Sequence, residues 1–411
     1  MTTAAASPES KAAEPTSSRP RFVARWDLDK TYLRTDFDTL RDIVRTAFER
    51  PDQKRTVPGA AALLRELGRA NVETHILSGS PEQLRSRLEA KLRLDGARWA
   101  SLTLKPNLQN MLRLRFRAVR GQLGFKLPAL LWRRAELALQ RDQQGQLVRE
   151  VLLGDDAEAD AFVYSLYADV CRGVVEAGEL ADILRLGGAY EDSVREAVRF
   201  ASYFERGDVV ERILIHLDRQ SSPSDFKPFG SRVVPFYNYL QAAFVLHEDG
   251  RIPAVAVLRV ALDLLVSHNF EPEALSRSYL DLQRRGHLTG VGLPDLDAAL
   301  RELLATKRVS GASELVTMME GAANAFAASQ TVDDPRKAAS TTPSPSPVSR
   351  RSVPPPSLGR PGAARPSTPP PPAASIAPQV RPRLEVLSPI DYRTMVLHHN
   401  PRRAKAEAKR K

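Results

Sequence analysis

The chain has 411 residues, of which 42% are hydrophobic, so it can bury a substantial core. This composition excludes a wholly disordered protein. The formal net charge of +11 is local, because residues 336–411 hold 15 Lys and Arg against 3 Asp and Glu. The rest of the chain is close to neutral.

Targeting and cysteine signals are sparse. Residues 1–20 lack the apolar core of a secretory signal and predict a disordered leader. Cys171 is the only cysteine, which excludes an intramolecular disulfide and a cysteine-rich zinc site. The longest apolar stretch, 253–266, contains Arg259 and Asp263 and is too short to span a bilayer. We therefore expect a cytoplasmic protein, with peripheral membrane association as an alternative.

Residues 21–173 alternate between strand and helix patterns, which predicts an α/β fold with a parallel, Rossmann-like sheet. Strands are expected at 21–27, 72–77, 101–104 and 147–153, and helices at 60–70, 81–94, 127–140 and 157–171. Ser80 is expected to cap the helix at 81–94, with Pro81 at its first position and Gln83 three residues after the cap.

The remainder of the chain divides into two parts. Residues 174–330 hold amphipathic segments separated by Gly, Ser and Pro, and predict a second, all-helical domain. Residues 331–411 predict a disordered, basic, Pro/Arg-rich tail, because 15 of the 31 prolines lie between Pro335 and Pro382 in a stretch without aromatic residues.

Polar residues follow the predicted strands of the first domain. They are Asp27, Asp29 and Thr31 after the first strand, Ser78 after the second, Lys126 at a helix start, and Asp155, Asp156 and Asp160 after the last strand. The carboxyl ends of parallel strands meet at one edge of a sheet, so these side chains should lie together. Each is individually explained by a turn, a cap or a helix N-terminus. Their ordered combination favours phosphoryl transfer, with carboxylates as nucleophile, proton carrier and Mg²⁺ ligands.

Four motifs carry a family resemblance: WDLDKT (26–31), THILSGSP (74–81), FKLP (125–128) and LLGDDAEAD (152–160). They resemble the haloacid dehalogenase (HAD) superfamily of aspartate-nucleophile phosphotransferases, and within it the App1-type phosphatidate phosphatase catalytic domain. The resemblance covers residues 21–172. Lys30, Gly79 and Glu82 stand where that family usually has an acidic residue, an Asn and a Trp.

The resemblance implies a role for each residue. Asp27 would attack phosphorus, Asp29 would act as general acid and base, and Thr31 would hold the loop. Ser78 and Lys126 would bind the phosphoryl oxygens. Asp27, the main-chain carbonyl of Asp29, and Asp155 would coordinate Mg²⁺, with Asp156 as a further candidate ligand and Asp160 supporting the ligand shell. The segments 32–71 and 84–125 are too short for a large cap, which predicts an open site.

The sequence thus predicts a Mg²⁺-dependent phosphomonoesterase with an aspartyl-phosphate intermediate, and phosphatidate or another phospholipid is a candidate substrate. Two alternatives stay open: a HAD-like binding or regulatory module without turnover, and a phosphatase acting on nucleic-acid ends. The basic tail would bring the protein to an anionic membrane surface. Nucleic acid is the less favoured partner, because the basic tail alone suggests it.

Overall fold

The computed structural model describes residues 22–33, 55–105, 123–137, 141–142, 145–157, 159–306, 309–332 and 389–398. The predicted leader and the segments of the predicted open site at 34–54 and 106–122 lie outside the described residues. The chain forms two compact units, residues 1–326 with 388–411, and residues 327–387. The sheet and the candidate site belong to the first unit.

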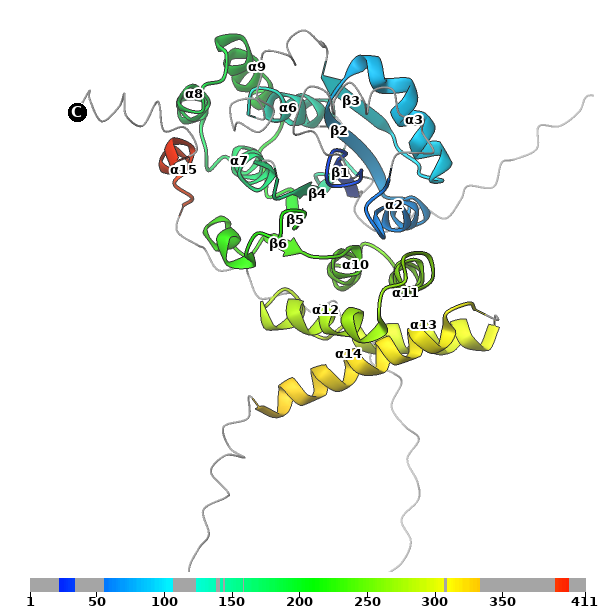
Figure 1. The fold of residues 1–411 in the computed structure, drawn as a ribbon. Coiled ribbons are helices and arrows are strands. Elements are labelled where there is room, and N and C mark those ends of the chain that lie inside the picture. The colour runs from blue at the N-terminus through cyan, green and yellow to red at the C-terminus, as the bar shows by residue number, and fades with distance from the viewer. Residues whose placement is uncertain are drawn as a thin grey trace, which may run out of the picture. The chain divides into compact units, whose positions relative to one another are not determined.

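Six strands form one parallel sheet (Figure 1). They are β1 (Phe22–Asp27), β2 (Glu73–Pro81), β3 (Ser101–Lys105), β4 (Arg149–Asp155), β5 (Val210–His216) and β6 (Val233–Phe236). Their order is β3-β2-β1-β4-β5-β6, and every neighbouring pair is parallel. The direction of winding reverses between β1 and β4, and ligands of open α/β sheets bind at such a switch point.

Helices cover both faces of the sheet. They are α2 (Ala60–Arg69), α3 (Arg85–Leu94), α6 (Lys126–Leu137), α7 (Asp160–Arg172), α8 (Ala177–Leu186), α9 (Glu191–Ala201), α10 (Tyr239–Glu248), α11 (Ala254–Leu262), α12 (Pro272–Arg284), α13 (Leu293–Thr306), α14 (Ala312–Val332) and α15 (Tyr392–His398). Glu82–Leu84 and Pro223–Phe229 form 3₁₀ turns, and Asp263–Ser267 forms a π-helical turn.

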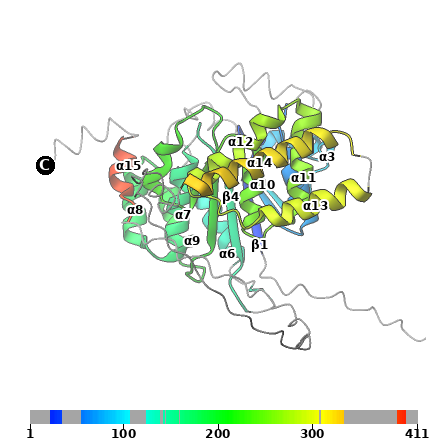
Figure 2. The ribbon, with the colours of Figure 1, turned by 90° about the horizontal axis from the view of Figure 1, so that it is seen from below.

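Two hydrophobic cores lie on the two faces of the sheet. Val151 and Leu153 of β4 enter one core, and Leu152 between them enters the other, as the alternation of side chains along a strand requires. The first core includes α2, α3 and α10 to α14, and the second includes α6 to α9 and α15. In Figure 2, which views the molecule from below, α10 to α13 lie on the face of the sheet that the first core covers. The fold is therefore a three-layer α/β arrangement.

The prediction of four alternating strands within 21–173 is confirmed by β1 to β4. The predicted helix at 81–94 begins too early. β2 continues through Pro81, and α3 starts at Arg85 after a 3₁₀ turn. The Ser80 hydroxyl bonds to Asp29 in the turn after β1, and so it does not cap a helix.

The prediction of an all-helical domain at 174–330 is wrong. β5 and β6 extend the same sheet, which therefore continues past the expected boundary at residue 173. The polar pair Glu211-Arg212 interrupts the apolar pattern of β5, and β6 has only four residues, including a proline. Pro235 is tolerated because β6 is an edge strand, paired on one side only within the described sheet.

The prediction of a disordered tail over 331–411 is wrong for α15. The Tyr392 hydroxyl donates a hydrogen bond to Asp169 of α7 (2.7 Å), and its ring meets Phe162 edge-on at 5.5 Å between centroids. Val396 is fully buried. The tail segments 333–388 and 399–411, which carry most of the positive charge, lie outside the described residues. Among the helices that the structure describes, none has the length and apolar character needed to cross a membrane.

Candidate active site

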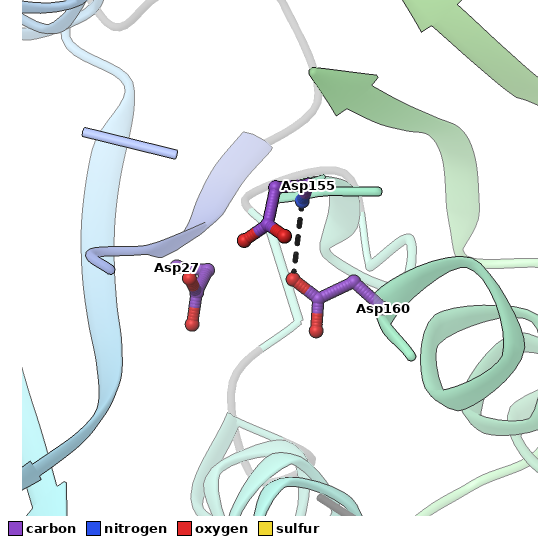
Figure 3. Close-up of side chains that lie close together, drawn as sticks. All are labelled: Asp27, Asp155 and Asp160. Atoms are coloured by element: carbon purple, nitrogen blue, oxygen red, sulfur yellow. Dashed lines mark hydrogen bonds between the residues drawn. The ribbon is translucent and has the colours of Figure 1, made fainter. Parts of the chain in front are cut away.

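Three carboxylates meet at the switch point of the sheet. Asp27 ends β1, Asp155 ends β4, and Asp160 begins α7. All three are fully buried, and one oxygen of each lies within 4.8 Å of the others (Figure 3). Gly154 makes this approach possible, because a Cβ at that position would lie 2.4 Å from Asp160 Oδ2. We call Asp27, Asp155 and Asp160 the acidic cluster.

Hydrogen bonds fix the orientation of the acidic cluster. Asp160 Oδ2 accepts from the main-chain N–H of Asp155 (3.2 Å), as Figure 3 shows, and Asp155 Oδ1 accepts from the N–H of Ala157 (2.7 Å). The Thr31 hydroxyl lies 3.4 Å from Asp27 Oδ2 and 3.3 Å from Asp155 Oδ2. Thr31 thus links the carboxylates of two neighbouring strands.

Lys126 contributes a buried cation to the same place. Its Nζ lies 2.9 Å from Asp27 Oδ1 and also bonds to Asp160 Oδ1. Lys126 is the first residue of α6, as predicted. Three carboxylates and one ammonium leave an excess of negative charge if all are ionised, and buried charge requires compensation. The cluster therefore offers hard oxygen ligands and a charge that suit a divalent cation such as Mg²⁺.

Asp29 is held by hydroxyl groups of β2. Ser78 Oγ donates to Asp29 Oδ2 (2.7 Å), and Ser80 Oγ lies 3.2 Å from both carboxylate oxygens. The main-chain N–H of Ser80 donates to Ser78 Oγ (3.0 Å). Ser80 is not among the residues that the sequence predicts for the site, although its spacing of two from Ser78 places both on one face of an extended strand.

Residues 28–33, which follow β1, form a tight turn. Lys30 adopts a left-handed conformation (φ 60°), and its N–H donates to the carbonyl of Leu33 (2.8 Å). Tyr239, from the first turn of α10, donates its hydroxyl to the carbonyl of Thr31. A residue of the expected second domain therefore completes the loop that carries the predicted catalytic residues.

Aromatic rings line the end of the sheet under the site. The Tyr239 ring stacks on Trp26 (5.8 Å between centroids, 15° between planes) and on His216 (5.6 Å, 29°). Burial raises the pKa of the Tyr239 phenol, and the nearby negative charges of Asp155 and Asp27 raise it further. Tyr239 is therefore a neutral hydrogen-bond donor to the loop at physiological pH.

Asp156 lies next to Asp155 in sequence but outside the acidic cluster. Its two carboxylate oxygens accept hydrogen bonds from the main-chain N–H groups of Arg219 (2.8 Å) and Ser221 (3.0 Å). The structure therefore brings together Asp27, Thr31, Lys126, Asp155 and Asp160, and places Asp29 with Ser78. It directs the Asp156 side chain to the segment after β5.

Comparisons with known proteins add no family to this description. The chain matches no family model, and the search of curated proteins finds no match.

Proposed function

We propose that the chain is a HAD-like, Mg²⁺-dependent phosphomonoesterase with Asp27 as its nucleophile. The observation that carries this proposal is the buried acidic cluster with Lys126 at the switch point of a parallel sheet. Burying closely spaced charges costs free energy of folding, and such groups are concentrated at functional sites. Phosphatidate or another phospholipid remains a candidate substrate on the resemblance alone.

The donor set fits a divalent metal. Asp27, Asp155 and Asp160 would hold it through carboxylate oxygens, and the predicted main-chain ligand at Asp29 lies on the adjoining turn. When bound, Mg²⁺ supplies positive charge that offsets the repulsion between the anionic substrate and the anionic nucleophile. Asp160 is assigned a direct contact because its carboxylate lies within the acidic cluster, whereas the Asp156 carboxylate lies outside it and accepts from the segment after β5.

The remaining residues account for two displacements at phosphorus. The Asp27 carboxylate attacks phosphorus, the bond from phosphorus to the ester oxygen breaks, and Asp29 gives its proton to the departing alcohol. Asp29 then accepts a proton from water, which attacks the aspartyl phosphate and releases inorganic phosphate and free Asp27. Ser78 exchanges its bond to Asp29 for a phosphoryl oxygen. Lys126 neutralises charge on the transferred group.

Substitution of the nucleophile tests the proposal directly. Asp27→Asn is nearly isosteric but cannot attack phosphorus, so phosphate release should fall below detection while the circular dichroism spectrum stays unchanged. The substrate panel comprises phospholipid, nucleotide and small phosphomonoesters. Asp297→Asn, on the exposed surface of α13, is the matched control and should retain activity. Undiminished turnover by folded Asp27→Asn contradicts the mechanism, and an inactive wild type on the whole panel favours the binding-module alternative.

A further inference from the structure

The residue after Asp155 fixes a loop. Asp156 accepts one hydrogen bond from the N–H of Arg219 and one from the N–H of Ser221 (2.8 and 3.0 Å), and its own N–H donates to the carbonyl of His216 (3.0 Å). One residue at the end of β4 thus uses both carboxylate oxygens and its main-chain N–H on the segment that follows β5. We call residues 217–222 the β5 loop.

The β5 loop borders the candidate active site. β5 is the neighbour of β4 in the sheet, and His216 pairs with Asp155 in register. The Tyr239 hydroxyl donates to the carbonyl of Thr31, and the Tyr239 ring stacks on His216, the residue directly before this loop. The β5 loop therefore begins beside the ring that supports the turn at residues 28–33.

Arg219 is the cation of this loop. Its side chain is exposed, and within the described residues its guanidinium makes no ion pair or hydrogen bond. The buried guanidiniums of Arg25 and Arg134, in contrast, are both bound to Glu150. A guanidinium presents a planar set of donors that matches a carboxylate or a phosphate. Because the hydrogen bonds of Asp156 already fix the backbone at Arg219, binding an anion through its guanidinium costs less conformational entropy.

We propose that Arg219 binds a second anionic group on the substrate and that Asp156 is the positioning residue that holds Arg219 in place. The inference rests on the proposed phosphomonoesterase function and narrows its substrate class. The substrate would be a phosphomonoester whose alcohol portion carries another negative charge. Asp156 acts through the backbone of the β5 loop, which explains why an acidic residue stands beside the cluster without joining it.

Two esters that differ in one group test this assignment. 3-Phosphoglycerate and glycerol 3-phosphate share a three-carbon skeleton, and only the first carries a carboxylate. Wild type should prefer 3-phosphoglycerate in kcat/KM. Arg219→Gln should reduce that preference about fivefold, through KM, which is the upper range for an exposed ion pair. Arg219→Lys should retain most of it. Arg301→Gln, at an exposed position on α13, removes the same charge and should leave the preference unchanged.

The positioning role has its own readouts. Asp156→Asn loses one of two acceptors, so it should reduce the preference as Arg219→Gln does, and the double variant should show no further loss. Asp156→Asn should also accelerate hydrogen exchange at the amides of Arg219 and Ser221, whereas Arg219→Gln should not. This exchange measurement does not depend on turnover.

The possible failures can be distinguished. If wild type hydrolyses phosphomonoesters but shows no preference for 3-phosphoglycerate, the inference is overturned and the proposed function stands. An unchanged preference in Arg219→Gln, or additive losses in the double variant, also overturns it. If wild type hydrolyses no ester of the panel, the proposed function fails and the inference fails with it.

Discussion

Asp155 and Asp156 are adjacent residues with different partners, and this difference predicts their effects on metal binding. Asp155→Asn removes a charged oxygen from the acidic cluster and should weaken Mg²⁺ binding at least tenfold, which is about 1.4 kcal/mol or more. Asp156→Asn should change it little, because that carboxylate accepts from Arg219 and Ser221. Titration calorimetry with Mg²⁺ measures both. Equal losses in the two variants would contradict the assignment of ligands.

Glu150 predicts the response of the fold to acid. Burial alone would raise the pKa of Glu150, but the charges of Arg25 and Arg134 and the hydrogen bonds from Arg25 and Tyr167 lower it to about 2. Because this folded-state pKa lies below the unfolded value of 4.5, the stabilisation is complete above about pH 4.5 and is lost as the pH falls toward 2. The linkage is worth about 3 kcal/mol.

The free energy of unfolding between pH 5 and pH 2 measures this contribution. Glu150→Gln should flatten the acid dependence, since the amide does not titrate in this range. It should also cost about 3–5 kcal/mol at pH 7, because two buried guanidiniums lose their counter-charge. A wild-type stability that is constant down to pH 2 would show that Glu150 is not stabilised in this way.

At the scale of elements, we expect the short helix α15, which lies far from α7 in the sequence, to stabilise the fold. Tyr392→Phe leaves the ring contact with Phe162 but removes the hydroxyl from Asp169, which should lower the free energy of unfolding by about 1–2 kcal/mol. Tyr203→Phe, at a position where the side chain is mostly exposed, is the control and should have almost no effect. Urea unfolding compares the two. Equal stability of Tyr392→Phe and wild type would mean that α15 does not dock in solution.

The elements also show why sequence reasoning succeeded in one half of the sheet and failed in the other. β1 and β4 are buried on both faces and are mainly apolar, with Arg25 the one charged residue before Asp27 in β1 and an uncharged stretch from Val151 to Gly154 before Asp155 in β4. In β5, Arg212 pairs with Asp249 and Glu211 pairs with Arg251. These ion pairs satisfy polar residues in a strand interior, and their partners lie far along the chain, where a local pattern gives no signal.

The side chains of the site show a similar limit. Strand ends predict that Asp27, Thr31, Lys126 and Asp155 should converge, and the structure brings them together. Asp160 belongs to the acidic cluster because Gly154 allows its side chain to approach closely. Asp156 does not belong to it because its carboxylate accepts hydrogen bonds from the β5 loop. Neither is visible in spacing alone, because both are contacts between segments.

For the whole molecule, the separation of charge predicts a salt-sensitive interaction with anionic surfaces. Residues 336–411 carry a net charge of +12, and each basic residue near an anionic membrane contributes on the order of 1 kcal/mol. Removing the tail after Asp334 would also remove α15, so charge should be changed without truncation. Replacing the six arginines at 350, 351, 360, 365, 381 and 383 by glutamine should weaken binding to anionic vesicles and leave hydrolysis of a soluble ester unchanged.

Binding at low and high salt, to vesicles and to single-stranded DNA, separates the two surfaces that the tail could meet. The effect of the arginines should shrink as salt rises, because screening acts beyond a Debye length of about 8 Å at physiological salt. Preferential loss of DNA binding would favour the nucleic-acid alternative. If the variant without the six arginines binds vesicles and single-stranded DNA as wild type does, these arginines do not contribute to either interaction.

The hydrogen bond from Tyr239 to the carbonyl of Thr31 joins residues that are 208 positions apart. β1 likewise pairs with β4, so the turn at residues 28–33 is supported by segments made much later in synthesis. Such non-local contacts slow folding, because a long stretch of chain must be closed before they form. During synthesis on the ribosome, the turn that carries Asp29 and Thr31 can form its hydrogen bond to Tyr239 only after α10 has emerged from the exit tunnel. The proposed activity should therefore appear late and abruptly during synthesis.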